Sequence, residues 1–218
     1  MKFKSMALLM LTMAMPAMAD QVTVNTQGVS LVLDVENGQP AKYLYFGARL
    51  DERDKANLSV TANGRMDVYP AYGLNTPAES ALALRHADGN MSTALVATGY
   101  DSRQEANATV TVIHLKDAVY PVKVDLCYRA YKDVDLIEAW SEITNEEKGT
   151  VTLTTFASAM LPIRRGNVWM SHLSGTWASE GYVNNELLTP GEFVIRNADG
   201  TRNSHTDHAE VMFSLDGK

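Results

Sequence analysis

Short segments rich in Val, Ile, Leu, Thr and Tyr recur along the chain, and glycine-containing turn dipeptides separate many of them. Several alternate apolar and polar residues, which is the pattern of a strand with one buried face. The pattern predicts strands at residues 22–26, 29–35, 42–46, 81–86, 93–99, 108–115, 122–131, 134–145, 151–159, 168–172, 192–197 and 210–215. Asn37-Gly38, Asp88-Gly89 and Asp199-Gly200 are typical of the turns between such strands.

The succession of strands predicts the fold class. No amphipathic helix longer than about ten residues is expected after residue 20. Many short strands without alternating helices favour an all-β sandwich or barrel. No linker rich in Pro, Gly or Ser interrupts residues 20–218, so we expect one domain there. The chain stops just after the last predicted strand, so this domain is expected to be incomplete at its C-terminal end.

The first nineteen residues have the layout of a signal peptide. Lys2 and Lys4 form a basic start, an apolar run follows at residues 6–15, and Ala17-Met18-Ala19 resembles a cleavage site. The apolar run is too short to span a bilayer. We therefore expect cleavage after Ala19 and a periplasmic or secreted protein.

Charge and cysteine content narrow the possible partners. The net charge of -7 argues against a general affinity for nucleic acid, which requires basic surfaces. The single cysteine, Cys127, cannot form an internal disulfide. It lies within the apolar run 122–131, where a buried, unreactive thiol is expected. Neither nucleic acid nor a membrane is an expected partner of the mature chain.

The histidines near the C-terminal end are the first candidates for chemistry. His205, Asp207 and His208 are close in sequence, and His172 lies upstream. In a strand, His205 and Asp207 would share a face while His208 would point away. The helical H-E-x-x-H spacing of a zinc site is absent. We expect a polar loop or hairpin end here, with no metal and no other cofactor.

Other catalytic arrangements are equally unsupported. No G-x-S-x-G motif is present, and Ser174 has no identifiable base partner. A glycosidase needs two carboxylates at a defined separation, which a sequence alone does not reveal. Many of the acids lie beside predicted turns, where a solvated surface explains them. No catalytic residue is assigned.

The segment Tyr69-Pro-Ala-Tyr-Gly73 is the best candidate for a binding loop. Proline and glycine interrupt strand pairing there, so the segment is expected to leave the sheet and present aromatic rings. Loops carry binding residues more often than strands do. Aromatic rings are suited to stacking on the C–H face of a sugar, although in sandwiches most of them lie in the core.

Several motifs, in order along the mature chain, resemble those of glycoside hydrolase family 36 alpha-galactosidases. Lys42-Tyr-Leu-Tyr-Phe-Gly-Ala-Arg-Leu50 resembles its "hLyyGxxl" segment, and Tyr69–Gly73 resembles its Y-x-x-Y-G loop. Residues 135–145 resemble a long strand of the family that ends in Asn, and residues 172–180 resemble its "HLxGxWxxE" motif. Residues 188–191, together with 200–205, resemble its "LxPG…GxSSH" motif.

The resemblance implies a β-supersandwich, of the galactose-mutarotase-like kind, that precedes a (β/α)8 barrel. In that family the barrel carries both catalytic aspartates, and hydrolysis retains the anomeric configuration. The chain ends before such a barrel could begin. It is therefore expected to be a truncated front domain that supports the missing barrel and is inactive alone. Galactosides are the implied substrate of the parent enzyme, and a homo-oligomer is an implied assembly.

The family's loop continues as T-G-D-x-R, and its Asp can reach the galactose site of a neighbouring subunit. Here Thr76 stands in place of that Asp and Ala78 in place of the Arg. Asn75 is left as a hydrogen-bonding group, so Tyr72 and Asn75 are the predicted substrate contacts. Two alternatives remain open: a stand-alone carbohydrate-binding or mutarotase-like sandwich, and a purely structural interaction module. His172–Glu180 is expected to be scaffold, with Trp177 as a packing anchor.

Overall fold

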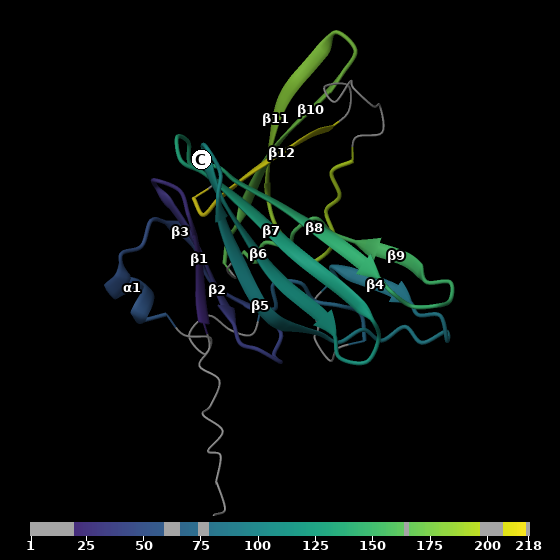
Figure 1. Ribbon diagram of the computed structural model, residues 1–218. Helices are drawn as coiled ribbons and strands as arrows, with labels where there is room; N and C mark the ends of the chain where they lie inside the picture. The colour runs from purple at the N-terminus through teal and green to yellow at the C-terminus, as the bar shows by residue number, and fades with distance from the viewer. Residues whose placement is uncertain (1–19, 59–65, 74–78, 164–165, 197–206, 217–218) are drawn as a thin grey trace, which may run out of the picture. The chain divides into compact units, whose positions relative to one another are not determined.

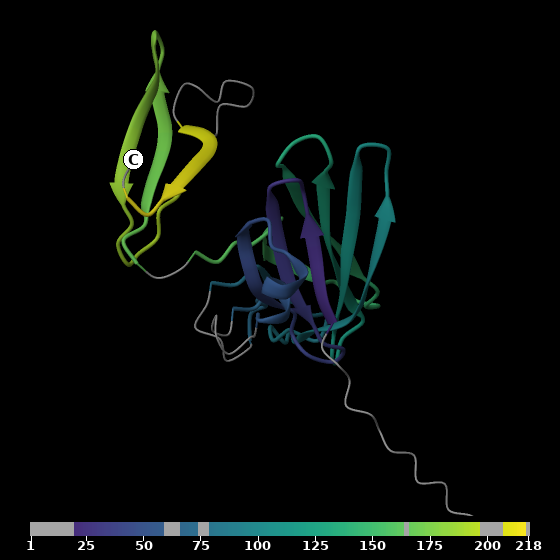
Figure 2. The same cartoon turned by 90° about the vertical axis from the view of Figure 1, so that its left-hand side faces the viewer.

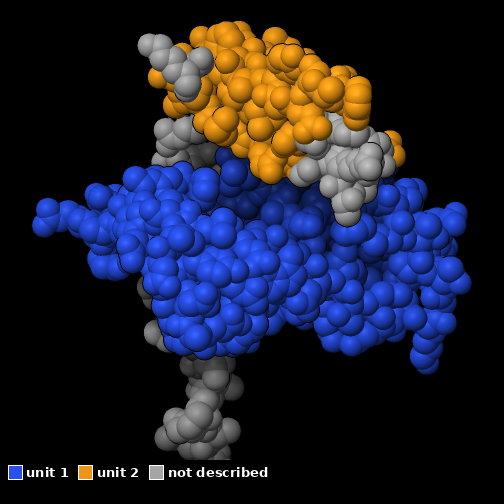
Figure 3. Space-filling view, turned by 90° about the horizontal axis from the view of Figure 1, so that it is seen from above, with its two compact units in different colours: residues 1–162 blue, residues 163–218 orange. Residues whose placement is uncertain are grey.

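The computed structural model describes residues 20–58, 66–73, 79–163, 166–196 and 207–216. The chain divides into two compact units, Met1–Pro162 and Ile163–Lys218 (Figure 3). The sequence predicted one domain over residues 20–218, whereas the structure has two compact units. Each unit is described by itself. The proposed signal peptide lies outside the described residues. Within them, no helix has the length and hydropathy needed to cross a membrane.

Nearly all regular structure is β-strand, which confirms the predicted all-β class. The strands are β1 (Asp20–Asn25), β2 (Val29–Val35), β3 (Lys42–Ala48), β4 (Leu82–Arg85), β5 (Leu95–Gln104), β6 (Ala108–Asp117), β7 (Val122–Tyr131), β8 (Ile137–Asn145), β9 (Thr152–Phe156), β10 (Trp169–Thr176), β11 (Ser179–Leu187) and β12 (Asp207–Ser214). The described residues also include one short helix, α1 (Glu52–Ala56). Asp51 caps its N-terminus, since the Asp51 carboxylate accepts the Asp54 N–H at 2.7 Å.

The first unit contains three antiparallel sheets, with strand orders β1-β2-β3, β4-β9 and β5-β6-β7-β8 (Figures 1 and 2). Consecutive strands pair within the first and third sheets, so their connections are short hairpins. The β4-β9 sheet instead joins segments about seventy residues apart in sequence. This is the sandwich that the family resemblance implies.

Alternation along the strands builds the core of the first unit. In β7 every second residue is buried in the core, namely Val122, Val124, Leu126, Tyr128 and Ala130. The buried cluster also includes residues of β1 to β6, so the inner faces of all three sheets share one core. Polar groups reach it at a few places. The Tyr43 hydroxyl, for example, donates to the Met160 carbonyl after β9.

The second unit is a three-stranded antiparallel sheet with the order β11-β10-β12. β10 and β11 form a hairpin that closes at Trp177-Ala178, because Thr176 pairs with Ser179 across the turn. Ala178 adopts a left-handed backbone with φ of 60°. The sequence left open whether Trp177 faces the core or the missing barrel; at this tip it is 81% exposed, so it does not pack in a core of this unit.

Two strand assignments in the second unit are wrong. The predicted strand at 192–197 is absent from its described part, residues 192–196. Phe193 instead contacts His172 edge-on, with ring centroids 5.2 Å apart, so the segment packs through a side chain and not through a ladder. β11 was missed because Ser179–Leu187 alternates poorly and exposes side chains on both faces. Its pairing with β10 places it in the sheet.

Candidate functional site

The Tyr69–Gly73 segment forms no strand of its own, as its Pro and Gly predict, but a single parallel bridge joins Ala71 to Leu82 of β4. Its two tyrosines lie in different surroundings. Tyr69 is 4% exposed, and its hydroxyl donates to the Ala157 carbonyl at 2.8 Å. Tyr72 is 49% exposed. Tyr69 is therefore a core residue, while Tyr72 offers an aromatic ring to solvent. Asn75, the other predicted contact, lies outside the described residues.

Backbone hydrogen bonds fix the main chain at Tyr72 on both sides. The Tyr72 N–H donates to the Leu82 carbonyl at 2.8 Å, and the Thr93 N–H donates to the Tyr72 carbonyl at 2.9 Å. Pro70 accepts from the Ala81 N–H at 2.7 Å. Because Pro70 has no backbone N–H, it cannot donate to a strand ladder and is suited to a segment outside the regular strands. The loop is thus attached to β4 on one side and to residue 93 on the other.

Gly73 lets the loop approach the segment before β5. Its φ of 96° lies in the left-handed region that favours glycine. A Cβ at this position would lie 2.6 Å from the Cα of Ser92, which is a backbone atom and cannot rotate away. Glycine is therefore required at position 73 for two independent reasons. The position of Tyr72 depends in turn on where residues 92 and 93 are held.

A buried histidine holds residues 92 and 93. The His86 side chain is fully buried, and its Nδ1 lies 2.7 Å from the Glu147 Oε1. Its Nε2 lies 3.2 Å from both the Ser92 carbonyl oxygen and the Thr93 Oγ1. His86 thereby connects the loop that follows β8 with the segment that contacts the Tyr72 loop.

The direction of the hydrogen bond at Nδ1 follows from the carboxylate. The Ala87 N–H donates to the Glu147 Oε2 at 3.0 Å, and this bond, followed by the contact with His86, lowers the pKa of Glu147. An ionised carboxylate only accepts, so Nδ1 of His86 carries the proton and donates. A ring protonated at Nδ1 alone leaves Nε2 able to accept from the Thr93 hydroxyl, whereas a hydrogen bond to the Ser92 carbonyl, which only accepts, requires a proton on Nε2 as well. Each polar group of this buried pair therefore has a partner.

Tyr120, from the turn between β6 and β7, covers the histidine. The two rings stack with centroids 3.5 Å apart and planes 13° from parallel. The Tyr120 hydroxyl donates to the Asp88 Oδ2 at 2.8 Å and accepts from the Asn90 Nδ2 at 2.9 Å. The Asn90 N–H, and then this hydroxyl, lower the pKa of Asp88. The 86–93 turn is thus bound by side chains from two other loops.

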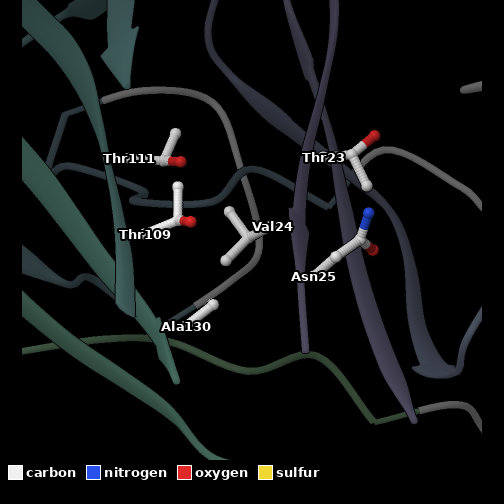
Figure 4. A pocket seen from close by; sticks show the side chains of 6 residues that line it. All are labelled: Thr23, Val24, Asn25, Thr109, Thr111 and Ala130. Atoms are coloured by element: carbon white, nitrogen blue, oxygen red, sulfur yellow. The ribbon is translucent and has the colours of Figure 1, made fainter. Parts of the chain in front are cut away.

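A crevice in the first unit lies between β1, β6 and β7 (Figure 4). It has a volume of about 110 Å³ and is lined by Thr23, Val24, Asn25, Thr109, Thr111 and Ala130. Thr111 and Thr109 already bond Ser102 and Gln104 of β5, at 2.9 and 3.1 Å. The space suits a few water molecules, and its hydroxyl groups are engaged within the protein. We assign no ligand to it.

The histidines singled out near the C-terminal end do not converge. His172 is 7% exposed, and its Nε2 lies 3.7 Å from the Glu186 Oε1, beyond hydrogen-bonding distance. His208 lies 3.3 Å from a Glu210 oxygen. His205 is outside the described residues. Within the described residues, no group of three or more His, Cys, Asp or Glu side chains is arranged to hold a metal ion.

Two other predicted features can be placed. Cys127 is buried on β7, as expected, and burial, followed by the nearby charges of Glu142 and Asp125, raises its pKa to about 11. Ser174 on β10 accepts a hydrogen bond from the Asn184 side chain at 2.7 Å. The thiol is thus a poor nucleophile at neutral pH, and the serine hydroxyl has a structural partner.

The raised carboxyl pKa values mark no acid pair either. Burial, followed by the charge of Glu36, raises the pKa of Asp34, and burial raises that of Asp67. Lys42 pairs in register with Asp34 on one side and with Asp67 on the other. The three residues form an acid-base-acid row across neighbouring strands, an arrangement that stabilises a sheet surface.

Sequence reasoning missed the buried group behind Tyr72. His86 was included in a predicted strand, Tyr120 carried no motif, and Glu147 was not singled out. The Asp88-Gly89 turn was the one local signal present, and it is formed, with the Gly89 N–H donating to the His86 carbonyl at 2.9 Å. Contacts between three loops far apart in sequence leave no spacing pattern to recognise.

Comparison with known proteins agrees with this sandwich. Residues 39–217 match the model of the glycosyl hydrolase family 36 N-terminal domain. A probable alpha-galactosidase C of Aspergillus terreus is 31% identical over 78 residues, which are 36% of this chain and 10% of that protein. Alpha-galactosidase 2 of Pediococcus pentosaceus is 26% identical over 147 residues, which are 61% of this chain and 20% of that protein.

Solved structures with the same fold are also alpha-galactosidases. That of Lactobacillus brevis gives a TM-score of 0.76 at 20% identity and covers 91% of this chain and 31% of its own. AgaA of Geobacillus stearothermophilus, in complex with raffinose, gives 0.75 at 18% identity over 88% of this chain and 31% of its own. At these identities the likeness establishes the fold alone.

The fold class is therefore the β-sandwich found in family 36 alpha-galactosidases. The chain belongs to the glycosyl hydrolase family 36 N-terminal domain family, as the motifs of residues 42–50, 69–73 and 172–180 indicated. It spans about a tenth to a fifth of the length of the curated relatives and about a third of the solved chains. The functional roles of Tyr72 and Asn75 remain predictions.

Proposed function

We propose that this chain is the non-catalytic N-terminal domain of an exported alpha-galactosidase. The observation that carries the proposal is the match of residues 39–217 to the family 36 N-terminal domain, together with relatives that are alpha-galactosidases. The domain supports the catalytic (β/α)8 barrel of such an enzyme and takes part in its oligomerisation. It does not itself supply the nucleophile or the general acid.

Three carboxylates of the first unit favour a supporting role, while the two with raised pKa values, Asp34 and Asp67, lie on either side of Lys42. Asp88, Asp135 and Glu147 have lowered pKa values, in each case with a backbone N–H as the first cause. A general acid near neutral pH needs a raised pKa instead. These three groups hold loops in place and stay ionised, which suits a scaffold.

An assay with a chromogenic alpha-galactoside tests the proposal. The 218-residue chain should release no galactose above the background rate. A parallel reaction with a complete family 36 enzyme verifies that the assay detects hydrolysis. Turnover by the purified chain at an enzyme-like rate, and its persistence through a second purification step, would contradict a non-catalytic role.

The surface of the second unit supports a covering partner. Large apolar side chains of its strands are exposed, among them Val183, Leu187, Met212 and Phe213. Exposed apolar surface of this extent is typical of an interface. We infer that the barrel of the parent enzyme covers part of it. Hydrogen exchange on this unit, with and without a co-expressed family 36 barrel, should show greater protection of β11 and β12 when the barrel is present.

Export is the second part of the proposal. The basic start, apolar run and Ala17-Met18-Ala19 site of the sequence support it. Mass spectrometry of the chain recovered from a bacterial periplasm should give Asp20 as the N-terminal residue. A chain that retains Met1, in the cytoplasm, would count against export.

Tyr72 and Asn75 are proposed to contact a galactoside in the assembled enzyme. The half-exposed Tyr72 ring on a fixed backbone supports this role, since aromatic rings stack on sugars. Galactose titrated into the chain, followed by the Tyr72 ring resonances, tests for contact in the isolated domain. A saturable shift of the Tyr72 signals is the expected result, and a saturable heat of galactose binding should be lost in Tyr72→Ala; an unchanged Tyr72 signal would contradict direct contact.

A further inference from the structure

We propose that His86, acting with Glu147, is the positioning residue that sets the orientation of Tyr72. Its relevance to sugar binding rests on the proposed function, whereas the positioning itself does not. The two residues are not adjacent to Tyr72 in sequence, and His86 does not contact it directly. The connection runs through residues 92 and 93.

The first step of the connection anchors His86. Glu147 accepts from the His86 Nδ1 at 2.7 Å and from the Ala87 N–H at 3.0 Å, so one carboxylate fixes both the ring and the main chain beside it. Gly149 packs against the same turn, since a Cβ there would lie 2.6 Å from the Ala87 Cβ. The loop after β8 therefore holds the start of the 86–93 turn closely.

The second step carries this position to the end of the turn. The His86 Nε2 lies 3.2 Å from the Ser92 carbonyl oxygen and from the Thr93 Oγ1. Thr93 is itself fully buried. A buried ring with its partners satisfied has few alternative orientations, because each departure leaves a polar group unpaired. Residues 92 and 93 are consequently held at a defined distance from the loop after β8.

The third step reaches Tyr72. The Thr93 N–H donates to the Tyr72 carbonyl at 2.9 Å, and Ser92 fills the space that a side chain at Gly73 would need. A shift of residues 92 and 93 must therefore move the Tyr72 main chain or break this bond. Within the part of the chain that the structure describes, the half-exposed Tyr72 side chain makes no hydrogen bond, so its position follows that of the backbone.

The experiment uses the 218-residue chain labelled with ¹⁵N and with ¹³C in its tyrosine rings. The variant is His86→Ala, and the matched control is His114→Ala. His114 is also bound by two carboxylates, Asp125 at 2.7 Å and Asp101 at 2.9 Å, but on the outer face of the four-stranded sheet. Exchange of the Thr93 amide and the ring signals of Tyr72 are recorded for each.

His86→Ala should speed exchange of the Thr93 amide by about tenfold or more and move the Tyr72 ring signals, while Ile113 in β6 exchanges as before. His114→Ala should change neither Thr93 nor Tyr72. His86→Gln, whose amide can reach residues 92 and 93, should restore part of the Thr93 protection. Unchanged Thr93 and Tyr72 signals in a folded His86→Ala chain would overturn the proposal, as would equal effects of the control.

If His86→Ala does not fold, Glu147→Gln is the variant to measure instead. It keeps the size of the side chain and removes its charge, so the Tyr72 signals should shift in the same direction and by less. No shift in that folded variant would also overturn the proposal. Galactose titrations on the same samples separate the two claims. If galactose leaves Tyr72 unaffected in the native chain but His86→Ala still moves it, sugar contact fails and positioning stands.

Discussion

Gly73 lies against the backbone of Ser92 so closely that a Cβ on residue 73 would be 2.6 Å from the Ser92 Cα. Gly89, in the turn nearby, has a similar φ of 91° but nothing within 4 Å of its would-be Cβ. The two glycines therefore separate the cost of a left-handed backbone from the cost of a steric clash. The first cost applies to both and the second only to Gly73.

We expect Gly89→Ala to lower the free energy of unfolding by about 1 kcal/mol, the cost of a left-handed conformation for an L residue. Gly73→Ala should cost about 1–3 kcal/mol more, because Ser92 cannot move aside without losing the Thr93–Tyr72 bond. Urea unfolding of both variants measures the difference. Equal losses would mean that the 73–92 contact is looser than the distance indicates.

The carbonyl of Ala157 accepts from both the Tyr69 hydroxyl and the Ser141 hydroxyl, each at 2.8 Å. Tyr69→Phe should cost about 1 kcal/mol, because Ser141 keeps the carbonyl paired. The double variant with Ser141→Ala leaves it without a partner and should cost about 1–2 kcal/mol more than the sum of the single losses. A double-mutant cycle in urea measures this coupling, and additivity would refute it.

His114 should make stability depend on pH near neutrality. Its pKa is raised first by the hydrogen bond to Asp125 and further by Asp101, while burial acts in the opposite direction. Because the folded pKa exceeds the unfolded value of about 6.5, the contribution is complete below that value and is lost as pH rises through the folded pKa. Asp125→Asn should move the NMR titration of His114 to lower pH and flatten the stability profile between pH 6 and 8.

Cys127 should react slowly with thiol reagents. A pKa of about 11 in place of 9.0 leaves roughly 100-fold less thiolate at pH 8, and burial restricts access as well. Labelling with a chromogenic disulfide should be slower than for a free thiol by at least this factor and should become rapid in urea. Fast labelling of the folded chain would show that β7 opens easily.

β9 should promote self-association of the 218-residue chain. Among the strands that the structure describes it pairs with β4 alone; it carries no charge and exposes Leu153 and Phe156. An uncharged edge strand with exposed apolar residues invites pairing with another chain. Leu153→Lys should therefore reduce the apparent mass in light scattering at high concentration. A native chain that is monomeric under these conditions would contradict the prediction.

The sequence predicted the fold where one face of a strand is buried. β7 matches its predicted residues at both ends, because one of its faces packs in the core. β2 also matches at both ends, although residues 30–33 are buried on both faces and do not alternate. β11 was missed, since Ser179–Leu187 gains its order from pairing with β10 and not from a buried face of its own. The predicted strand at 192–197 failed for a related reason, as Phe193 packs on His172 without a ladder.

The candidate site was predictable only in part. Proline and glycine indicated that residues 69–73 leave the sheet, but not that Tyr69 would turn inward and Tyr72 outward. The His86–Glu147 pair depends on three loops that meet in space, and local sequence patterns carry no information about such meetings. Family motifs located the loop, while the distances around His86 required coordinates.

The separation of Tyr69 from Tyr72 also has a consequence for protein engineering. Tyr69 holds the loop through its buried hydroxyl, and the main chain of residue 72 is hydrogen-bonded on both sides. The side chain at position 72 can therefore be replaced with little change in the free energy of unfolding. A saturation library at this single codon would therefore sample new surface chemistry on an unchanged framework. Selection for new binding activity can begin there.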